Sequence, residues 1–337
     1  MIDKLKSFYD KRKTIILLVL LAAAIALPFL IDKGSVMSII VRILFYVILA
    51  SSLNIINGYS GQFNIGHAGF VLIGSYTLSI LAHMNWPVWL LFLVAGVVTS
   101  LVGFLVSLPT LRLRGIYLAL VTLGFSEILR LVALNWTSLT GGPMGIKGIP
   151  TPWFFGLRAS SPHNYYFIVL LFVILCLFTS HRVINSKVGR AWMSIREDDH
   201  AAMSLGVNIA KYKSINFMFG AFWAGVGGAL MAPFYTFIDS SMFSLDEGFN
   251  ILSMVIIGGQ GTLIGPVVGS VVVNLTTELF RFANEARLLI YAIMIISMMW
   301  LRPQGLAGTS RSVIANRSLG RDRGAFFRKL FKKKEVK

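Results

Sequence analysis

Apolar runs without charged residues follow one another along most of the chain, and short polar connections separate them. A run of about 18 apolar residues is long enough to cross the hydrocarbon core of a membrane as a helix. On this basis we expect ten spans, some of them broken or re-entrant, at residues 14–31, 36–56, 66–83, 87–108, 115–134, 164–180, 214–236, 248–259, 263–277 and 287–302. The pattern predicts an all-α, polytopic membrane protein with one transmembrane domain (14–302) between a short N-terminal tail (1–13) and a basic C-terminal tail (303–337).

Composition supports the same class. Of the 337 residues, 56% are hydrophobic and the mean hydropathy is +0.75, so a soluble domain is excluded. The net charge of +17 comes from Lys and Arg in the tails and loops, and no basic face on a folded domain is evident. This distribution argues against nucleic-acid binding and indicates orientation in a membrane.

The same charges predict the orientation, because Lys and Arg concentrate in cytoplasmic segments of membrane proteins. The tail after Arg302 carries ten Lys/Arg and should therefore be cytoplasmic. Ten spans meet this condition, whereas one tilted helix over 248–277 would place the tail outside. We therefore expect both termini and the charged segment 181–213 to face the cytoplasm.

Two long apolar regions are interrupted by glycine-rich breaks, Gly58–Gly66 and Gly258–Gly265. Non-helical backbone at membrane depth persists only where protein buries it or where it lines a cavity, and paired broken helices indicate a transport path. Asn54, Asn57 and Thr262 add polar groups nearby. We expect a translocation path formed by Gln62, Asn64, Gly66, His67, Gly69, Gly259, Gln260 and Gly265. The alternative is two tight cytoplasmic turns, but such turns normally carry Lys or Arg, and these carry none.

His67, directly after the first break, allows two interpretations. It could relay protons or bind a ligand, or it could cap or pack the helix that starts there, which is the commoner role of a lone histidine. The other histidines are scattered over different loops. The sequence predicts no metal site, since such a site needs a cluster of ligands.

Three charged residues fall inside predicted spans, where charge is costly and usually paired. Glu127 and Arg130 are one helical turn apart, so we expect a local ion pair. Arg42 has no obvious partner in the sequence.

Small residues recur every four positions in the span 214–236, as Gly220, Ala224 and Gly228. Ala221, Gly225 and Ala229 repeat the pattern one residue later. This arrangement predicts a flat helix face that another backbone approaches closely, in this chain or in another.

The segment 181–213 interrupts the spans with six Lys/Arg and three consecutive acids, Glu197–Asp199. Asp198 or Asp199 can cap a helix N-terminus, where acids also suit the helix dipole, and Gly206 can end the helix. We expect an exposed helix over Asp199–Leu205 that a partner protein could hold in a groove.

Residues Gly189–Gly206 resemble the coupling loop of bacterial ABC importer permeases, whose pattern is an acid, two alanines and a glycine four residues later. Ala201, Ala202 and Gly206 match, while His200 takes the place of the acid and Asp199 precedes it. The resemblance implies an ATPase-coupling loop formed by Arg196, Glu197, Asp198, Asp199, His200, Ala201, Ala202, Leu205 and Gly206.

The runs Gly58–Tyr76 and Gly225–Gly269 resemble LivM-type permease subunits of branched-chain amino acid importers, and the likeness extends over residues 36–305. It implies a bacterial inner-membrane permease that works with a second related permease, two cytoplasmic ABC ATPases and an extracytoplasmic substrate-binding protein, and that contacts membrane lipid. No cofactor is expected on this chain. ATP and Mg would be bound by the ATPase chains, in keeping with the lack of a G-x-x-x-x-G-K-[ST] loop here.

Other functions stay open on the sequence alone. Permeases for urea or short amides share these motifs, so the substrate is not fixed. A stand-alone channel or carrier would need no coupling loop. A membrane-embedded enzyme would need paired carboxylates, a nucleophile with its base or a metal cluster, and the spans contain none of these, so we expect a transport subunit and not an enzyme.

Overall fold

The computed structural model describes residues 24–84, 86–113, 115–154, 157–158, 161–279, 293, 296–297 and 304–308. Most of the predicted spans 14–31 and 287–302, the N-terminal tail and most of the C-terminal tail lie outside these residues.

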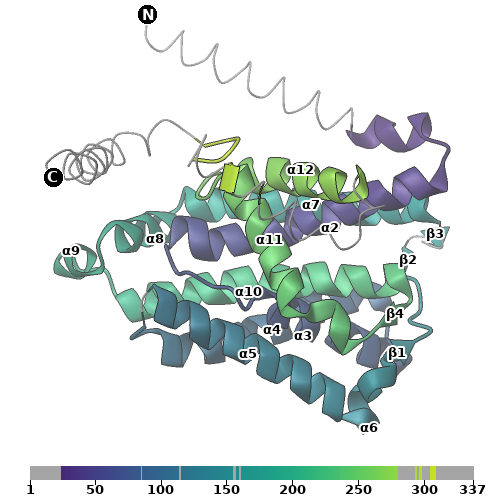
Figure 1. The fold of residues 1–337 in the computed structure, drawn as a ribbon, viewed down its shortest axis with the longest axis horizontal. Helices are drawn as coiled ribbons and strands as arrows, with labels where there is room; N and C mark the ends of the chain where they lie inside the picture. The colour runs from purple at the N-terminus through teal and green to yellow at the C-terminus, as the bar shows by residue number, and fades with distance from the viewer. Residues whose placement is uncertain are drawn as a thin grey trace, which may run out of the picture.

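Helices make up nearly all of the described chain (Figure 1). After a helical stretch at residues 24–30, the longer helices are α2 (Gly34–Asn54), α3 (His67–His83), α4 (Val88–Thr110), α5 (Ile116–Asn135), α7 (Pro162–Ile184), α8 (Lys187–Glu197), α10 (Ile209–Tyr235), α11 (Leu245–Gly258) and α12 (Gly265–Leu279). The shorter elements are the π-helical turn η1 (Ile55–Tyr59), α6 (Thr137–Thr140), η2 (Gly142–Met144), α9 (Asp199–Ser204) and η3 (Ser240–Phe243).

The predicted all-α membrane architecture is confirmed. Five helices in the described chain are long and apolar enough to cross a membrane: α2 with its π-helical extension, α4, α5, α7 and α10. By contrast, α3, α11 and α12 have 17, 14 and 15 residues. Ten passes therefore stay a prediction.

Polar and irregular elements lie at the two ends of the helix bundle (Figure 1). At one end are α6 and four two-residue strands: β1 (Ile146–Lys147) pairs antiparallel with β4 (Phe237–Ile238), and β2 (Trp153–Phe154) with β3 (Leu157–Arg158). At the opposite end are α8 and α9. This division fits a bundle whose middle lies in lipid and whose ends lie in water.

Helix boundaries differ from the predicted spans where charged residues lie inside a helix. α10 begins at Ile209, five residues before the predicted start, because the side chain of Asn208 accepts a hydrogen bond from the Lys211 N–H at 3.0 Å and caps the helix. An uncharged run therefore marks the membrane portion of this helix, while the capping residue marks its true start.

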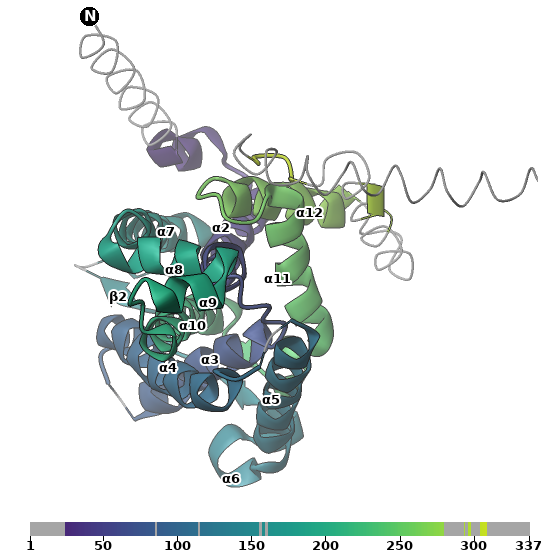
Figure 2. The ribbon, with the colours of Figure 1, turned by 90° about the vertical axis from the view of Figure 1, so that its left-hand side faces the viewer.

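α10 lies at the centre of the bundle, against α2, α3 and α4 (Figure 2). The predicted face of small residues makes these contacts within the chain itself. A Cβ added at Gly228 would overlap the Val71 carbonyl oxygen of α3, and one at Gly225 would overlap the Thr99 side chain of α4. Glycine therefore sets how closely the backbones of the central helices approach each other.

We expect Gly74→Ala to destabilise the protein, because the new Cβ would overlap the Gly225 carbonyl oxygen. Overpacking of this kind costs about 1–3 kcal/mol. Gly34→Ala is the matched control, since Gly34 begins α2 with nothing within 4 Å of the added atom. Thermal unfolding midpoints in detergent should fall for Gly74→Ala only. Equal midpoints would show that α3 and α10 are not in such close contact.

Candidate functional site

The two predicted breaks lie against each other. In the first, α2 passes into the π-helical turn η1, and the chain then stays non-helical until α3 begins at His67. In the second, residues 259–264 join α11 to α12. The Asn54 side chain bridges the two: Nδ2 donates to the Thr262 carbonyl oxygen at 2.8 Å, and Oδ1 accepts from the Gly261 N–H at 2.8 Å. One amide side chain thus joins segments that are about two hundred residues apart in sequence.

Most of the first break is buried, as its lack of Lys and Arg predicted, although Gly61 and Phe63 are exposed. The side chain of Asn57 pairs with the backbone of Asn64, donating to its carbonyl oxygen and accepting from its N–H, both at 3.1 Å. The Ile65 N–H donates to Thr122 Oγ1 of α5 at 3.2 Å. Side chains therefore supply the hydrogen bonds that a helix would otherwise have given this backbone.

The second break is more open. Gln260 is exposed and Thr262 is half-buried, and Gly259 and Gly261 have φ values of 115° and 73° that favour glycine. Residues 304–308 cover its α11 side, where the Leu306 N–H donates to the Ile257 carbonyl oxygen at 2.9 Å. Of the predicted path residues, Gln62 and Asn64 therefore lie inside the protein and Gln260 lies at its surface.

His67 lies in the core between α2 and α3. Its Nε2 is 2.8 Å from the Ser52 hydroxyl, and its ring meets Phe70 edge-on. The side chain is fully buried. This position matches the packing interpretation of His67.

Several predicted path glycines lie where backbones touch. A Cβ at Gly66 would overlap the Thr122 carbonyl oxygen, and one at Gly69 would lie 2.9 Å from the Ser126 Cα. Both contacts are with α5. A Cβ at Gly265 would overlap the Gly259 carbonyl oxygen within the second break. These glycines have packing contacts, and their part in a translocation path stays a prediction.

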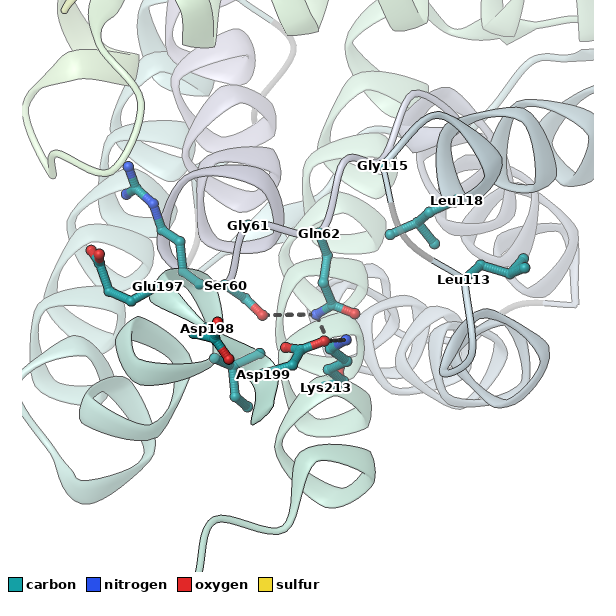
Figure 3. Close-up of a pocket in the computed structure, with 12 residues that line it drawn as sticks. Ser60, Gly61, Gln62, Leu113, Gly115, Leu118, Glu197, Asp198, Asp199 and Lys213 are labelled. Atoms are coloured by element: carbon teal, nitrogen blue, oxygen red, sulfur yellow. Dashed lines mark hydrogen bonds and ion pairs between the residues drawn. The ribbon is translucent and has the colours of Figure 1, made fainter. Parts of the chain in front are cut away.

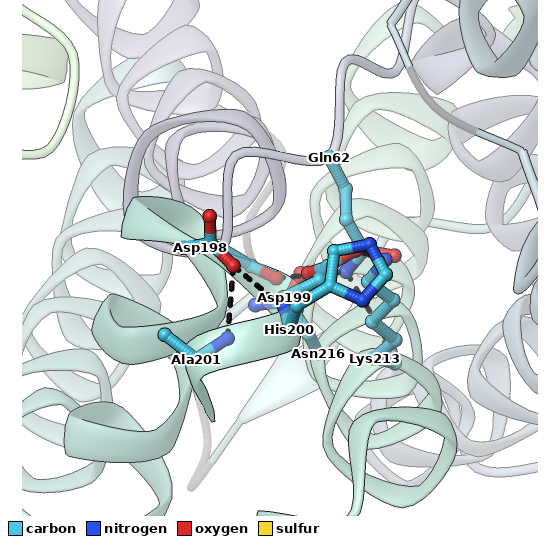
Figure 4. A network of polar contacts seen from close by, with 8 residues as sticks. Gln62, Asp198, Asp199, His200, Ala201, Lys213 and Asn216 are labelled. Atoms are coloured by element: carbon cyan, nitrogen blue, oxygen red, sulfur yellow. Dashed lines mark hydrogen bonds and ion pairs between the residues drawn. The ribbon is translucent and has the colours of Figure 1, made fainter. Parts of the chain in front are cut away.

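The charged segment forms two helices. The predicted helix is confirmed as α9, and the carboxylate of Asp198 caps it by accepting from the N–H groups of His200 and Ala201 at 2.7 and 2.9 Å (Figure 4). Gly206, with a φ of 81°, lies just after the end of the helix. The preceding α8 was not predicted. Its apolar face buries Trp192, whose Nε1 donates to the Tyr212 carbonyl oxygen at 2.9 Å.

A buried ion pair fixes α9 to the start of α10. Lys213 Nζ lies 2.9 Å from Asp199 Oδ2, and the two side chains are only 7% and 9% exposed (Figure 4). Beside them, Gln62 Nε2 donates to Ser60 Oγ and to Asn216 Oδ1, both at 3.0 Å. Asp199 is therefore part of the internal framework of this region and not of its outer surface.

Apolar side chains are exposed at the C-terminal end of α9. Leu205 is 82% exposed and Met203 56%, with His200 and Ala201 also at the surface. Ala202 faces inward and is 1% exposed. Two of the nine predicted coupling residues, Asp199 and Ala202, thus support the loop from within.

Arg196 connects α8 to both breaks. Its Nη1 donates a short hydrogen bond to the Gly58 carbonyl oxygen. The same nitrogen lies beside Gly261, at 2.6 Å from where a Cβ would be. A single guanidinium group from the charged segment therefore bonds the π-helical turn of the first break and lies beside Gly261 of the second.

A polar cavity of about 260 Å³ separates the charged segment from the first break and from the α4–α5 connection (Figure 3). Its lining comprises Ser60, Gly61, Gln62, Leu113, Gly115, Leu118, Ile195, Arg196, Glu197, Asp198, Asp199 and Lys213. The contact between α8 and the breaks is thus local, with open space next to it.

The intramembrane charges are paired. Arg130 Nε donates to both carboxylate oxygens of Glu127 at 3.0 Å, which confirms the predicted local pair. Arg42 has a partner that the sequence did not suggest: its Nη1 lies 3.8 Å from Glu278 Oε2, at the end of α12.

Sequence reasoning missed Lys213, Asn216 and Glu278. Lys213 and Glu278 border apolar runs, where charged residues are common, so only tertiary contacts show their partners. Asn216 could have been noticed in the sequence, because an amide side chain inside an apolar helix needs a hydrogen-bond partner.

Comparison with known proteins gives a consistent result. Residues 35–299 match the family described as branched-chain amino acid transport system / permease component. The high-affinity branched-chain amino acid transport system permease protein LivM of Salmonella typhimurium is 37% identical over 325 residues, which cover 89% of this chain and 76% of that protein. LivM of Escherichia coli is 36% identical over the same length and shares. The permease protein LivH of Escherichia coli is 24% identical over 288 residues, 78% of this chain and 91% of LivH. No solved structure matches the chain.

We expect Asp199→Asn to loosen the charged segment, because it removes a carboxylate that pairs with the buried ammonium group of Lys213. Trypsin should cleave the segment about tenfold faster, which corresponds to about 1.4 kcal/mol of local opening free energy. Glu197→Gln is the matched control, since Glu197 is an exposed acid in the same stretch. If both variants resist trypsin like the parent protein, the ion pair does not hold α9 in place.

Proposed function

The chain belongs to the family of permease components of branched-chain amino acid transport systems, and we propose that it is one of two permease subunits of an ATP-driven importer for branched-chain amino acids. The second subunit is a related permease of the LivH kind. Two cytoplasmic ATPases bind ATP and Mg and power the transport, and an extracytoplasmic protein delivers the amino acid. The permease is an integral membrane protein with its α8–α9 end and both termini in the cytoplasm.

One observation carries the coupling mechanism: a charged side chain from the charged segment bonds the backbone of the first break. Arg196 extends from α8 to the Gly58 carbonyl oxygen and to Gly261. A displacement of α8 therefore acts directly on the places where α2 and α11 lose their helical hydrogen bonding.

The outward side of α9 suits the ATPase contact. Leu205 and Met203 supply exposed apolar contact area, and His200 and Ala201 lie beside them. Because Asp199 is bonded to Lys213 and Trp192 is buried under α8, force on α9 passes into α8 and α10 instead of bending the loop alone. The segment acts as a stiff lever.

The breaks are suited to move. A π-helical turn such as η1 often marks a functional site, and broken helices allow one part of a transporter to rock against another. The cavity beside Arg196 leaves open space next to its side chain. In this mechanism, ATPase closure moves α8, changes the Arg196 contact with Gly58 and Gly261, and opens the path to one side of the membrane.

The complete complex in proteoliposomes should take up labelled leucine in an ATP-dependent manner. Unlabelled isoleucine and valine should compete, and urea should not, because the relatives are transporters of branched-chain amino acids. Omitting ATP serves as the control. Uptake of urea with no uptake of leucine would contradict the proposed substrate, and ATP-independent uptake would contradict the proposed energy source.

We expect Arg196→Ala to lower leucine uptake by about tenfold while ATP hydrolysis continues. The reason is that a hydrogen bond to a charged group contributes about 1.5–3 kcal/mol, and here it joins the lever to the breaks. Arg190→Ala on the same helix is the control, because Arg190 is exposed and reaches only the Asn185 carbonyl oxygen, at 3.4 Å. Full uptake by Arg196→Ala would show that coupling does not pass through this contact.

A further inference from the structure

α5 has a wide exposed face in the described structure. Only 28% of its most apolar stretch is buried, against 78% in α2 and in α10. The large apolar side chains exposed on it are Ile116, Tyr117, Leu120, Val121, Ile128, Leu131 and Val132. Figure 2 shows α5 at the edge of the bundle, beside α3 and α11.

This face also carries an ion pair at membrane depth. The side chains of Glu127 and Arg130 are 29% and 24% exposed. Glu127 is eight residues from Asn135 and Arg130 is five, so at 1.5 Å per residue they lie about 12 Å and about 7.5 Å from the nearer end of α5. Hydrocarbon chains cannot hydrogen-bond a carboxylate or a guanidinium group. Exposure of this pair to lipid would therefore cost free energy.

Two other helices show what a lipid-facing surface looks like in this protein. α4 has no charged residue, and its exposed large side chains include Leu93, Leu101 and Leu105. α7 has none between Asn164 and Ser180, and it exposes Leu171 and Leu175. Both faces are suited to hydrocarbon. The charged face of α5 differs from them and is suited to contact with protein.

We infer that this face of α5 docks the second permease subunit, an inference that rests on the proposed function. Gly124 lies one helical turn from Leu120 and from Ile128, and nothing lies within 4 Å of a Cβ placed on it. This leaves a notch in the face where another helix can approach closely. Arg130 engages Glu127 through Nε and Nη2, so Nη1 can donate to a polar group of the incoming helix.

The occupant is a chain of the same fold. The LivH relatives align with 78% of this chain, so a subunit of that kind has an equivalent of α5 to offer. Two such helices can meet about an approximate twofold axis, which is the usual arrangement of paired subunits. The translocation path would then run beside α5 and α11, on the side of the bundle where Gly66 and Gly69 contact α5.

The test places a photo-crosslinking amino acid at Leu120 or Ile128 of α5, in the complete complex in its native membrane. Leu101 on α4 and Leu171 on α7 are matched controls with 56% and 48% exposure, against 58% and 61% for the α5 positions. We expect a covalent adduct with the second permease from α5 only. Adducts from α4 or α7 with none from α5, adducts of α5 with lipid alone, or adducts with a second copy of this chain would overturn the inference.

A bulky residue in the notch gives an independent measurement. Gly124→Phe meets open space in this chain, so the subunit should accumulate normally, while the amount of second permease that co-purifies should fall about tenfold. Leu175→Phe on α7 is the control. Normal co-purification by Gly124→Phe would refute the docking site. Leucine uptake by the parent complex is measured separately, so failure of the interface and failure of the proposed function are distinguishable.

Discussion

The structure depends on one constraint: backbone that leaves a helix inside an apolar bundle must still find hydrogen-bond partners. Each buried N–H or C=O group without a hydrogen-bond partner lowers the stability of the folded protein by about 1–3 kcal/mol. The protein meets this cost with side-chain amides, hydroxyl groups and one cation. Asn57 bonds the backbone of the first break, Asn54 bonds that of the second, and Arg196 bonds the first break from outside the bundle. Hydrogen bonds that satisfy this backbone therefore join the two breaks to each other and the first break to α8.

This dependence explains why the charged segment is so firmly built. A loop that merely carried charge would need no buried tryptophan and no buried ion pair. Trp192 and the Asp199–Lys213 pair hold α8 and α9 as one piece, and that piece places Arg196. Arg196 can transmit a movement of the charged segment to the breaks only if α8 and α9 hold together as a rigid unit.

Local patterns in the sequence could predict what local physics determines. The breaks follow from glycine-rich interruptions, the capping of α9 by Asp198 or Asp199 from the acids before Ala201 and Ala202, and the Glu127–Arg130 pair from helical spacing. The contacts of Asn54 with Gly261 and of Arg42 with Glu278 join residues more than 200 positions apart, and no pattern along the chain encodes that proximity. α8 was missed for a different reason. Its charged residues cover the outer face of the helix, so counting uncharged runs cannot detect the buried face around Trp192.

Residues Gly189–Gly206 resemble a coupling loop whose pattern has an acid where this chain has His200, and the structure shows the surroundings of that histidine. Two tasks that require a carboxylate in this segment are already performed by its neighbours: Asp198 caps α9, and Asp199 pairs with Lys213. His200 itself is exposed, and its backbone N–H donates to Asp198 at 2.7 Å. The histidine therefore leaves the internal framework of the charged segment unchanged and alters the chemistry of its exposed surface. In the proposed importer, an ATPase that docks on this surface would need a group complementary to an imidazole in place of a partner for a carboxylate, which would favour its own permease over others.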